Sequence, residues 1–276
     1  MSIRNIKLIL SYDGTDYHGW QVQASDATVQ QVVERAIQVV TGKASRLACA
    51  GRTDSGVHAV GQVACFKTES KIPAVKFQAA LQRHLPENIT IRESAEVPED
   101  FHAGYDAKWK LYRYLILNSR VPNALLNRFS TRISAPLNVQ AMDQAAQFLV
   151  GVHDFRSFET DYPNKATSIR HIKHCKVRQG NSWPLWEPDI EGLPLPANDS
   201  SLVYLDIVAD GFLYNMVRAI MGTLLQIGRG DWPVEATDRI LKQLDRKEAG
   251  PTAPPQGLYL MHVEYEREFD EFVASR

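Results

Sequence analysis

The segment from Thr28 to Val40, TVQQVVERAIQVV, constrains the fold most, because its pattern predicts an amphipathic helix with both ends defined. Thr28 and Gln31 fit a capping box at its start, and Gly42 is suited to end it. The apolar residues fall on one helical stripe, which comprises Val29, Val32, Val33, Ala36, Ile37 and Val40. With this helix fixed, the elements on either side can be placed in order.

Strand-like runs and a second helix surround the first helix. The runs are Ile6–Leu10, Arg46–Ala50, Val57–Phe66 and Asn88–Val97, and the second helix is Pro73–Leu85, which Pro86 stops. The resulting order is β-α-β-β-α-β. This is the split βαβ, or ferredoxin-like, arrangement.

A similar but less regular set of elements follows. Strands are expected over 107–118, 168–177, 202–208 and 257–265, and helices over 139–149, 214–227 and 233–244. Residues 179–200, which hold two Trp and four Pro, are interpreted as an inserted loop. We therefore predict an α+β fold of two ferredoxin-like-related halves, residues 1–105 and 106–276, with antiparallel-rich sheets flanked by helices. The active cleft is expected between the halves.

Composition excludes several classes of protein. No apolar run among the 276 residues approaches the roughly 18 residues that span a bilayer. The start, MSIRNIKLIL, enters a strand-like run with no signal-peptide cleavage pattern. Cys49, Cys65 and Cys175 are few, odd in number and without a Cys-x-x-Cys pair, which argues against a disulfide framework or a cysteine zinc site. We expect a cytoplasmic protein.

The charges are segregated along the chain, although the formal net charge is only −1. No acidic residue occurs from Ala107 to Met142 or from Lys165 to Arg178. The cations of these segments are Lys108, Lys110, Arg113, Arg120, Arg128, Arg132, Lys165, Arg170, Lys173, Lys176 and Arg178. Such segregation is typical of a basic face that binds a polyanion, and ordinary solvated charges are the alternative.

Three motif-like stretches are rejected as sites. LILSYDGTD is similar to the nucleophile motif of haloacid dehalogenase-type phosphatases, but Ser11 stands where the nucleophilic Asp is needed. GKAS, residues 42–45, lacks the earlier glycine of a P-loop. His171 and His174 point to opposite faces of an expected strand, so with Cys175 they make a poor metal site, and no metal is predicted.

The strand AKWKLYRYLIL, residues 107–117, carries cations beside tyrosines. Its alternation predicts one core face, formed by Trp109, Leu111, Leu115 and Leu117. Lys108, Lys110, Tyr112 and Tyr114 are expected on the other face. Cations for phosphates and rings for bases are what a polynucleotide surface requires, whereas a wet sheet face with amphipathic tyrosines is the alternative.

One carboxylate, Asp54, lies between Arg52 and Gly56 in CAGRTDSGVHAVGQV, with strand-like residues on both sides. Asp and Gly favour turns for local backbone reasons, so this stretch alone leaves a turn and a reactive group both open.

The stretch AGRTDSGVHAVGQV is very similar to the active-site segment of the tRNA pseudouridine synthase A (TruA) family. YDGTDYHGWQVQ resembles the N-terminal motif of that family, PEDFHAGYDAKWKLYRYLI its hinge, MVRAIMGTLLQIG its late helix and GLYL its closing strand. These matches run in order over nearly the whole chain.

The resemblance implies an isomerase that converts uridine to pseudouridine at positions 38–40 of the tRNA anticodon stem-loop, without a cofactor. Asp54 matches the catalytic aspartate of the family. Tyr112 matches its active-site tyrosine, which the resemblance implies to stack on the target ring, with removal of the C5 proton as a second candidate role. Arg218 matches the arginine that pairs with the aspartate, where a nearby cation keeps a carboxylate ionised. Arg52 is the second candidate cation, expected to fill the gap that the extruded base leaves. Lys108 and Lys110 are expected to bind RNA, and the family implies a homodimer.

A few residues depart from the family pattern, and two alternatives stay open. Ser55 stands where the family usually has alanine, Lys110 and Gly104 stand where it often has arginine, and the 179–200 segment is long. The alternatives are a pseudouridine synthase with a different RNA target and a catalytically idle RNA-binding module of the same fold.

Overall fold

The chain folds into two units, and the boundary between them falls inside a strand. One unit holds Met1–Leu111 with Tyr259–Arg276, and the other holds Tyr112–Leu258. The computed structural model describes residues 3–23, 27–160, 167–180 and 201–274. No helix in these ranges is long and apolar enough to cross a membrane. The units group the C-terminal segment with the N-terminal one, whereas division into domains 1–105 and 106–276 stays a prediction.

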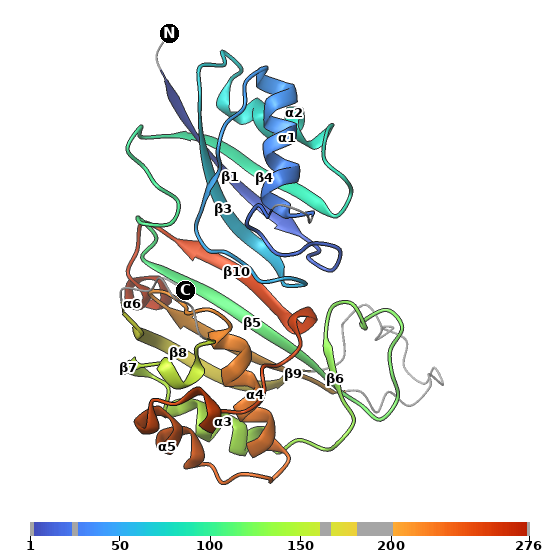
Figure 1. The fold of residues 1–276 in the computed structure, drawn as a ribbon, viewed down its shortest axis with the longest axis vertical. Coiled ribbons are helices and arrows are strands. Elements are labelled where there is room, and N and C mark those ends of the chain that lie inside the picture. The colour runs from blue at the N-terminus through green and yellow to red at the C-terminus, as the bar shows by residue number, and fades with distance from the viewer. Residues whose placement is uncertain (1–2, 24–26, 161–166, 181–200, 275–276) are drawn as a thin grey trace. The chain divides into compact units, whose positions relative to one another are not determined.

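Strand β1 (Arg4–Tyr12) lies at the centre of the first unit, antiparallel to β3 (His58–Thr68) and β4 (Ile89–Val97) (Figure 1). The short strand β2 (Ala48–Cys49) pairs antiparallel with one end of β3. The closing strand β10 (Leu258–Glu264) pairs in parallel with the other end, where Tyr259 faces His58. The predicted β-α-β-β-α-β order and the α+β class are therefore confirmed.

Helices α1 (Val29–Thr41) and α2 (Phe77–Gln82) contact each other in the first unit. The Thr28 hydroxyl accepts the Gln31 amide at the start of α1, and Gly42 ends it in a left-handed conformation, as predicted. The second helix is shorter than predicted, because Ala74–Lys76 form a 3₁₀ turn and no side chain caps α2. Alternate residues of β1 are buried and form the part of the core that the sheet contributes. These residues are Ile6, Leu8 and Leu10.

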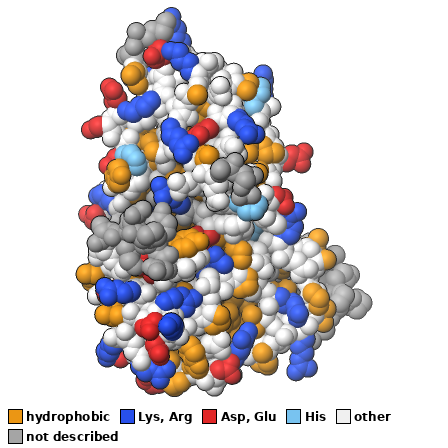
Figure 2. Space-filling model, in the orientation of Figure 1, with side chains coloured by type: hydrophobic (Ala, Val, Ile, Leu, Met, Phe, Trp, Pro, Cys, Tyr) orange, Lys and Arg blue, Asp and Glu red, His pale blue; other side chains and the backbone are white. Residues whose placement is uncertain are grey.

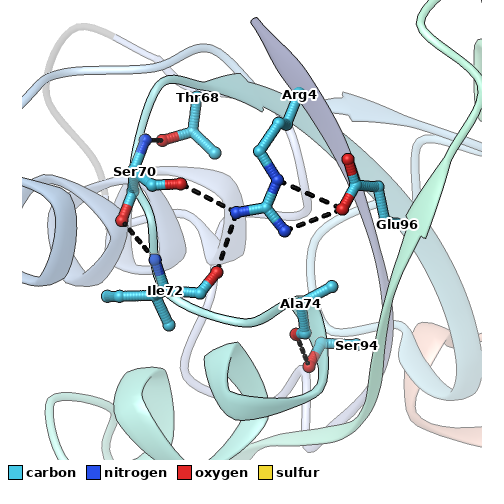
Figure 3. Close-up of polar contacts among 7 residues, drawn as sticks. All are labelled: Arg4, Thr68, Ser70, Ile72, Ala74, Ser94 and Glu96. Atoms are coloured by element: carbon cyan, nitrogen blue, oxygen red, sulfur yellow. Dashed lines mark hydrogen bonds and ion pairs between the residues drawn. The ribbon is translucent and has the colours of Figure 1, made fainter. Parts of the chain in front are cut away.

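A polar cluster ties the loop after β3 to the edge strand β4 (Figure 3). The Arg4 guanidinium donates to the Glu96 carboxylate and to the carbonyl oxygens of Ser70 and Ile72. The Ser94 hydroxyl donates to the Ala74 carbonyl at 2.7 Å. These bonds stabilise the loop without placing a reactive group there.

The second unit has strand order β5-β9-β8-β7, with β6 parallel to β5. Its strands are β5 (Trp109–Asn118, which begins in the first unit), β6 (Thr131–Ile133), β7 (Gly151–Asp154), β8 (Ile169–Gly180) and β9 (Ser201–Ala209). Its helices are α3 (Val139–Gln147), α4 (Met216–Gly228) and α5 (Ala236–Gln243). Helix α4 is buried along most of its length and packs against α3 and α5. A sixth helix, α6 (Phe269–Ala274), belongs to the first unit. The predicted insert lies outside the described residues from 181 to 200.

The predicted faces of β5 are wrong over Leu111–Leu115, although Trp109 and Leu117 are buried as predicted. Tyr112 and Tyr114 are buried, whereas Leu111 and Leu115 are half-buried. Burial of Tyr114 is tolerated because its hydroxyl donates to the Pro254 carbonyl and bonds the Thr131 hydroxyl, both at 2.7 Å. The polar face instead carries Arg113, which pairs with Asp206 at 2.7 Å. Because the Tyr114 hydroxyl has hydrogen-bond partners, a face that contains tyrosines can be buried in place of the face that contains leucines.

Candidate active site

Asp54 lies in the connection between β2 and β3, the Asp54 loop (Gly51–Val57). Hydrogen bonds hold this loop on both sides of the carboxylate. Gln62 donates its side-chain amide to the Gly51 carbonyl at 2.6 Å, and the hydroxyls of Thr53 and Tyr12 lie 2.8 Å apart. The Asp54 side chain is half-buried. The backbone is therefore fixed while the carboxylate stays within reach of solvent.

Burial sets the chemistry of Tyr12, the partner of Thr53. Tyr12 is 4% exposed, and desolvation raises the pKa of its hydroxyl far above the usual range. The phenol therefore stays neutral at physiological pH and acts as a hydrogen-bonding group. Its role is to hold the Asp54 loop rather than to exchange protons.

The segment Tyr12–Trp20 supports the other side of the Asp54 loop. The Tyr17 carbonyl accepts the Gly56 amide at 3.2 Å, and the Trp20 amide donates to the Thr53 carbonyl at 3.0 Å. Gly19 has a φ of +82°, and a Cβ there would lie 2.6 Å from the Thr53 oxygen. Only glycine fits such an approach without strain. The Tyr12–Trp20 segment, whose first residues belong to the phosphatase-like stretch, is therefore a support for the loop.

His58, four residues after Asp54, is buried at 1% exposure. Its Nδ1 accepts the Gly14 amide at 3.1 Å, and the Asp13 carboxylate lies 3.2 Å from the same nitrogen. Its ring stacks on Tyr259 at 4.9 Å. His58 thus joins β3, the Tyr12–Trp20 segment and β10. We did not identify it from the sequence, although a histidine inside an apolar strand is a signal that could have found it.

Tyr112 lies on β5 in the second unit, at 7% exposure. The Phe212 ring meets it edge to face, with centroids 4.9 Å apart. This packing fixes the plane of the Tyr112 ring, which a stacking role requires.

Arg218 lies in the first turn of α4, also in the second unit. Its Nη1 donates to the Asn215 side-chain oxygen at 2.7 Å, and its Nε donates to the Ala253 carbonyl at 2.8 Å. Asn215 itself adopts a left-handed conformation, with φ of 60°, and donates to the Thr160 hydroxyl. Asparagine adopts this region more readily than most other residues with a side chain, so the turn into α4 is tolerated here. Two acceptors therefore orient the guanidinium, and its pairing with Asp54 stays a prediction.

The remaining predicted cations differ in their surroundings. Arg52 is exposed on the Asp54 loop, and Lys110 on β5 is half-buried. Burial raises the pKa of the Cys49 thiol to about 11, and the positive charges of Arg52 and Lys110 oppose that rise. Both cations therefore act electrostatically on the Cys49 thiol. Lys108 instead donates to the Glu266 carbonyl at 2.9 Å and lies 3.4 Å from the Glu268 carboxylate. A phosphate must compete with that carboxylate for Lys108.

Comparison with known proteins assigns the chain to a family. A family model described as tRNA pseudouridine synthase matches residues 8–106 and 145–266. Three tRNA pseudouridine synthase A proteins are 45%, 41% and 44% identical to this chain, from Acetivibrio thermocellus, Thermoanaerobacter sp. (strain X514) and Moorella thermoacetica. The alignments cover 94–95% of this chain and 99–100% of those proteins. The chain belongs to the tRNA pseudouridine synthase family. Among solved structures, a Cbf5–Nop10–Gar1 complex aligns at 12% identity over 79% of this chain and 54% of that chain, with a TM-score of 0.28 that supports no argument.

Within this tRNA pseudouridine synthase, the departures from the family pattern have distinct surroundings. The Ser55 hydroxyl donates to the Tyr17 carbonyl at 3.3 Å, which adds a contact that alanine lacks. Gly104 lies beside the Cys49 carbonyl, 3.0 Å from where a Cβ would stand. Among the residues that the structure describes, no group of three or more His, Cys, Asp or Glu side chains could hold a metal ion.

Proposed function

We propose that this protein isomerises uridine to pseudouridine in the tRNA anticodon stem-loop, at positions 38–40, with Asp54 as the catalytic residue. The observation that carries the proposal is a half-buried carboxylate on a rigidly supported loop, in a chain of this family. The idle-module alternative is disfavoured, because Asp54, Tyr112 and Arg218 are all present in the sequence.

The reaction needs only positioned groups. The N1–C1′ bond of the uridine breaks, the base rotates, and C5 bonds to C1′ while the C5 proton moves to solvent and N1 gains a proton. Reactant and product have the same atoms, so no redox partner or group donor enters the balance. Asp54 supplies the nucleophile or base beside the glycosidic bond. Attack at C1′, attack at C6 and removal of a ribose proton are the three routes open to it.

Tyr112 and Arg218 are proposed to complete the site. Packing against Phe212 holds the Tyr112 ring ready to stack on the target base. The bonds from Arg218 to Asn215 and Ala253 hold its guanidinium in one orientation, which favours a fixed ion pair with Asp54. The base is extruded from the RNA stack to reach these groups, and Arg52 is proposed to fill the gap.

Binding of tRNA is proposed to use cations dispersed over the surface. Figure 2 shows Lys and Arg side chains spread among acidic ones on the visible face rather than gathered in one field. Such a surface binds a backbone through several separate phosphate contacts. A cytoplasmic homodimer is proposed from the family resemblance, and sedimentation of the purified protein tests the dimer.

Replacement of the carboxylate tests the proposed function. Asp54→Asn keeps the side-chain shape but removes the nucleophile and base, so pseudouridine formation should fall by about three orders of magnitude or more while tRNA affinity is retained. The measurement is single-turnover pseudouridine formation in an anticodon stem-loop transcript at saturating protein.

The matched control is Asp100→Asn, which changes an exposed carboxylate of the same unit. Wild-type activity is expected from it. An Asp54→Asn protein as active as Asp100→Asn would overturn the proposal, and a wild type that binds tRNA without modifying it would favour the idle module.

A further inference from the structure

A cavity of about 350 Å³ opens in the first unit, next to the Asp54 loop. Its walls come from four stretches of the chain: Trp20 and Gln21, Gln30 on α1, the run Arg46–Arg52, and the turn at His102, Gly104 and Tyr105. Asp54 does not line it, but Gly51 and Arg52 of the same loop do. The cavity is thus a neighbour of the proposed reaction site, and Arg52 is the one residue of its lining to which the proposed mechanism gives a role.

An exposed aromatic stack forms one rim of this cavity. The Tyr105 side chain is 86% exposed and stacks on the His102 ring, with centroids 4.1 Å apart and planes inclined by 25°. The amides of Gly104 and Tyr105 both donate to His102 Nδ1, at 3.0 and 3.2 Å. These bonds fix the imidazole, and the imidazole fixes the phenol. A large ring held in place in solvent offers a flat face for stacking.

Cations border the same cavity. Arg46 and Arg52 line it, and both side chains are exposed. Arg46 lies 3.5 Å from the Glu34 carboxylate, yet its side chain is 64% exposed, so it can contact a second anion. Lys110 acts electrostatically on Cys49 in the cavity wall. The acid nearest the stack in sequence is the exposed Asp106, whose carboxylate accepts the His102 amide at 2.8 Å.

Aromatic faces beside guanidinium groups select for nucleotides, because the ring stacks on a base while the cation binds the adjoining phosphate. We propose that this cavity binds one further nucleotide of the tRNA, distinct from the target uridine. Its base stacks on Tyr105, and its phosphate lies between Arg46 and Arg52. Because Arg52 belongs to the Asp54 loop, the nucleotide comes from the same stem-loop as the target. The proposal rests on the proposed function and adds a second place, besides the target uridine, at which the protein contacts a base of the tRNA.

Three variants test the stack. Tyr105→Ala removes an exposed ring without opening the core, and should weaken binding of an anticodon stem-loop transcript by about 5- to 150-fold. Tyr105→Phe keeps the ring and should restore wild-type affinity. Val75→Ala removes an apolar side chain that is 69% exposed in the same unit, and should change nothing. The single-turnover rate at saturating protein should stay at the wild-type value in all three.

An abasic scan of the transcript identifies the nucleotide. Each position outside 38–40 is replaced in turn by an abasic residue, and its affinity is measured with wild type and with Tyr105→Ala. At one position the abasic change should weaken binding to wild type but have no further effect on Tyr105→Ala, as expected for two halves of one contact. Equal affinity of wild type and Tyr105→Ala, or additive effects at every position, would overturn the inference. In either case a wild type that still forms pseudouridine leaves the proposed function intact.

Discussion

At the scale of single residues, neighbours decide which groups react. Tyr12 is kept neutral by burial and serves the Asp54 loop as a hydrogen-bonding group. Cys49 lies close by in the sequence, and burial raises its pKa to about 11 although Arg52 and Lys110 oppose this. Asp54 is the group of this region that combines a held backbone with a half-buried carboxylate. Tyr, Cys and Asp all have side chains that can react. The surroundings of each residue therefore decide which of the three can act in catalysis.

Alkylation of Cys49 checks this electrostatic picture. Only the thiolate reacts, and a pKa of about 11 leaves roughly one thiol in a thousand ionised at pH 8. The rate of modification by iodoacetamide should therefore rise about tenfold per pH unit from pH 7 to 9.5, without levelling off. Peptide mass spectrometry reads out Cys49, with the more buried Cys65 and Cys175 as internal comparisons. A plateau near pH 8.5 would show an ordinary thiol instead.

Replacement of Tyr112 separates stacking from proton transfer. Tyr112→Leu loses the ring, so binding of the stem-loop should weaken by about 1–3 kcal/mol. Tyr112→Phe should keep that affinity, and its single-turnover rate should fall if the hydroxyl moves the C5 proton. Affinity and rate are measured for both variants. Wild-type values of both quantities in both variants would place Tyr112 outside the site.

At the scale of elements, the Tyr12–Trp20 segment positions the Asp54 loop. Its contacts are backbone hydrogen bonds, together with a close approach at Gly19 that leaves no room for a side chain. The segment therefore acts as a template against which the loop is folded. Elements that fix a catalytic loop in this way affect rate as well as stability.

Two glycine substitutions separate loop positioning from backbone strain. Gly19→Ala and Gly42→Ala both place alanine at a positive φ, which costs about 1–2 kcal/mol of stability. A Cβ at Gly42 meets nothing within 4 Å, whereas a Cβ at Gly19 meets the Thr53 oxygen at 2.6 Å. Gly19→Ala should therefore be the less stable variant in urea unfolding, and it alone should slow single-turnover catalysis. Equal single-turnover rates in the two variants would show that the Tyr12–Trp20 segment does not position the Asp54 loop for catalysis.

At the scale of the whole molecule, binding of tRNA should depend steeply on salt. The log–log slope changes by about 0.7–0.9 for each phosphate neutralised, so a slope shallower than about −2 contradicts binding through several phosphate contacts. Lys110→Gln should make the slope shallower by about 0.7–0.9, the contribution of one phosphate contact. Lys108→Gln should reduce it less, because Glu268 already lies 3.4 Å from that ammonium group. Filter binding of one tRNA at four salt concentrations gives all three slopes.

The sequence alone determined the features whose causes are local. Thr28 caps α1 and Gly42 ends it because a hydroxyl and a missing Cβ act within one turn of the chain. The order of elements in the first unit followed from the period of the hydrophobic residues, and the family followed from short motifs spread over nearly the whole chain. The predicted roles of Tyr112, Arg52, Arg218, Lys108 and Lys110 came from the resemblance and stay predictions.

Only the tertiary structure decided features that depend on distant partners. Tyr114 is buried because Thr131 and Pro254 satisfy its hydroxyl, and no pattern within β5 contains that information. The same holds for His58, whose ring joins Gly14 to Tyr259. The cavity beside Arg52 is built from four separate stretches of the chain, between Trp20 and Tyr105. A polar group is stable inside a protein when its partner arrives from elsewhere in the chain, and the fold determines which partner arrives.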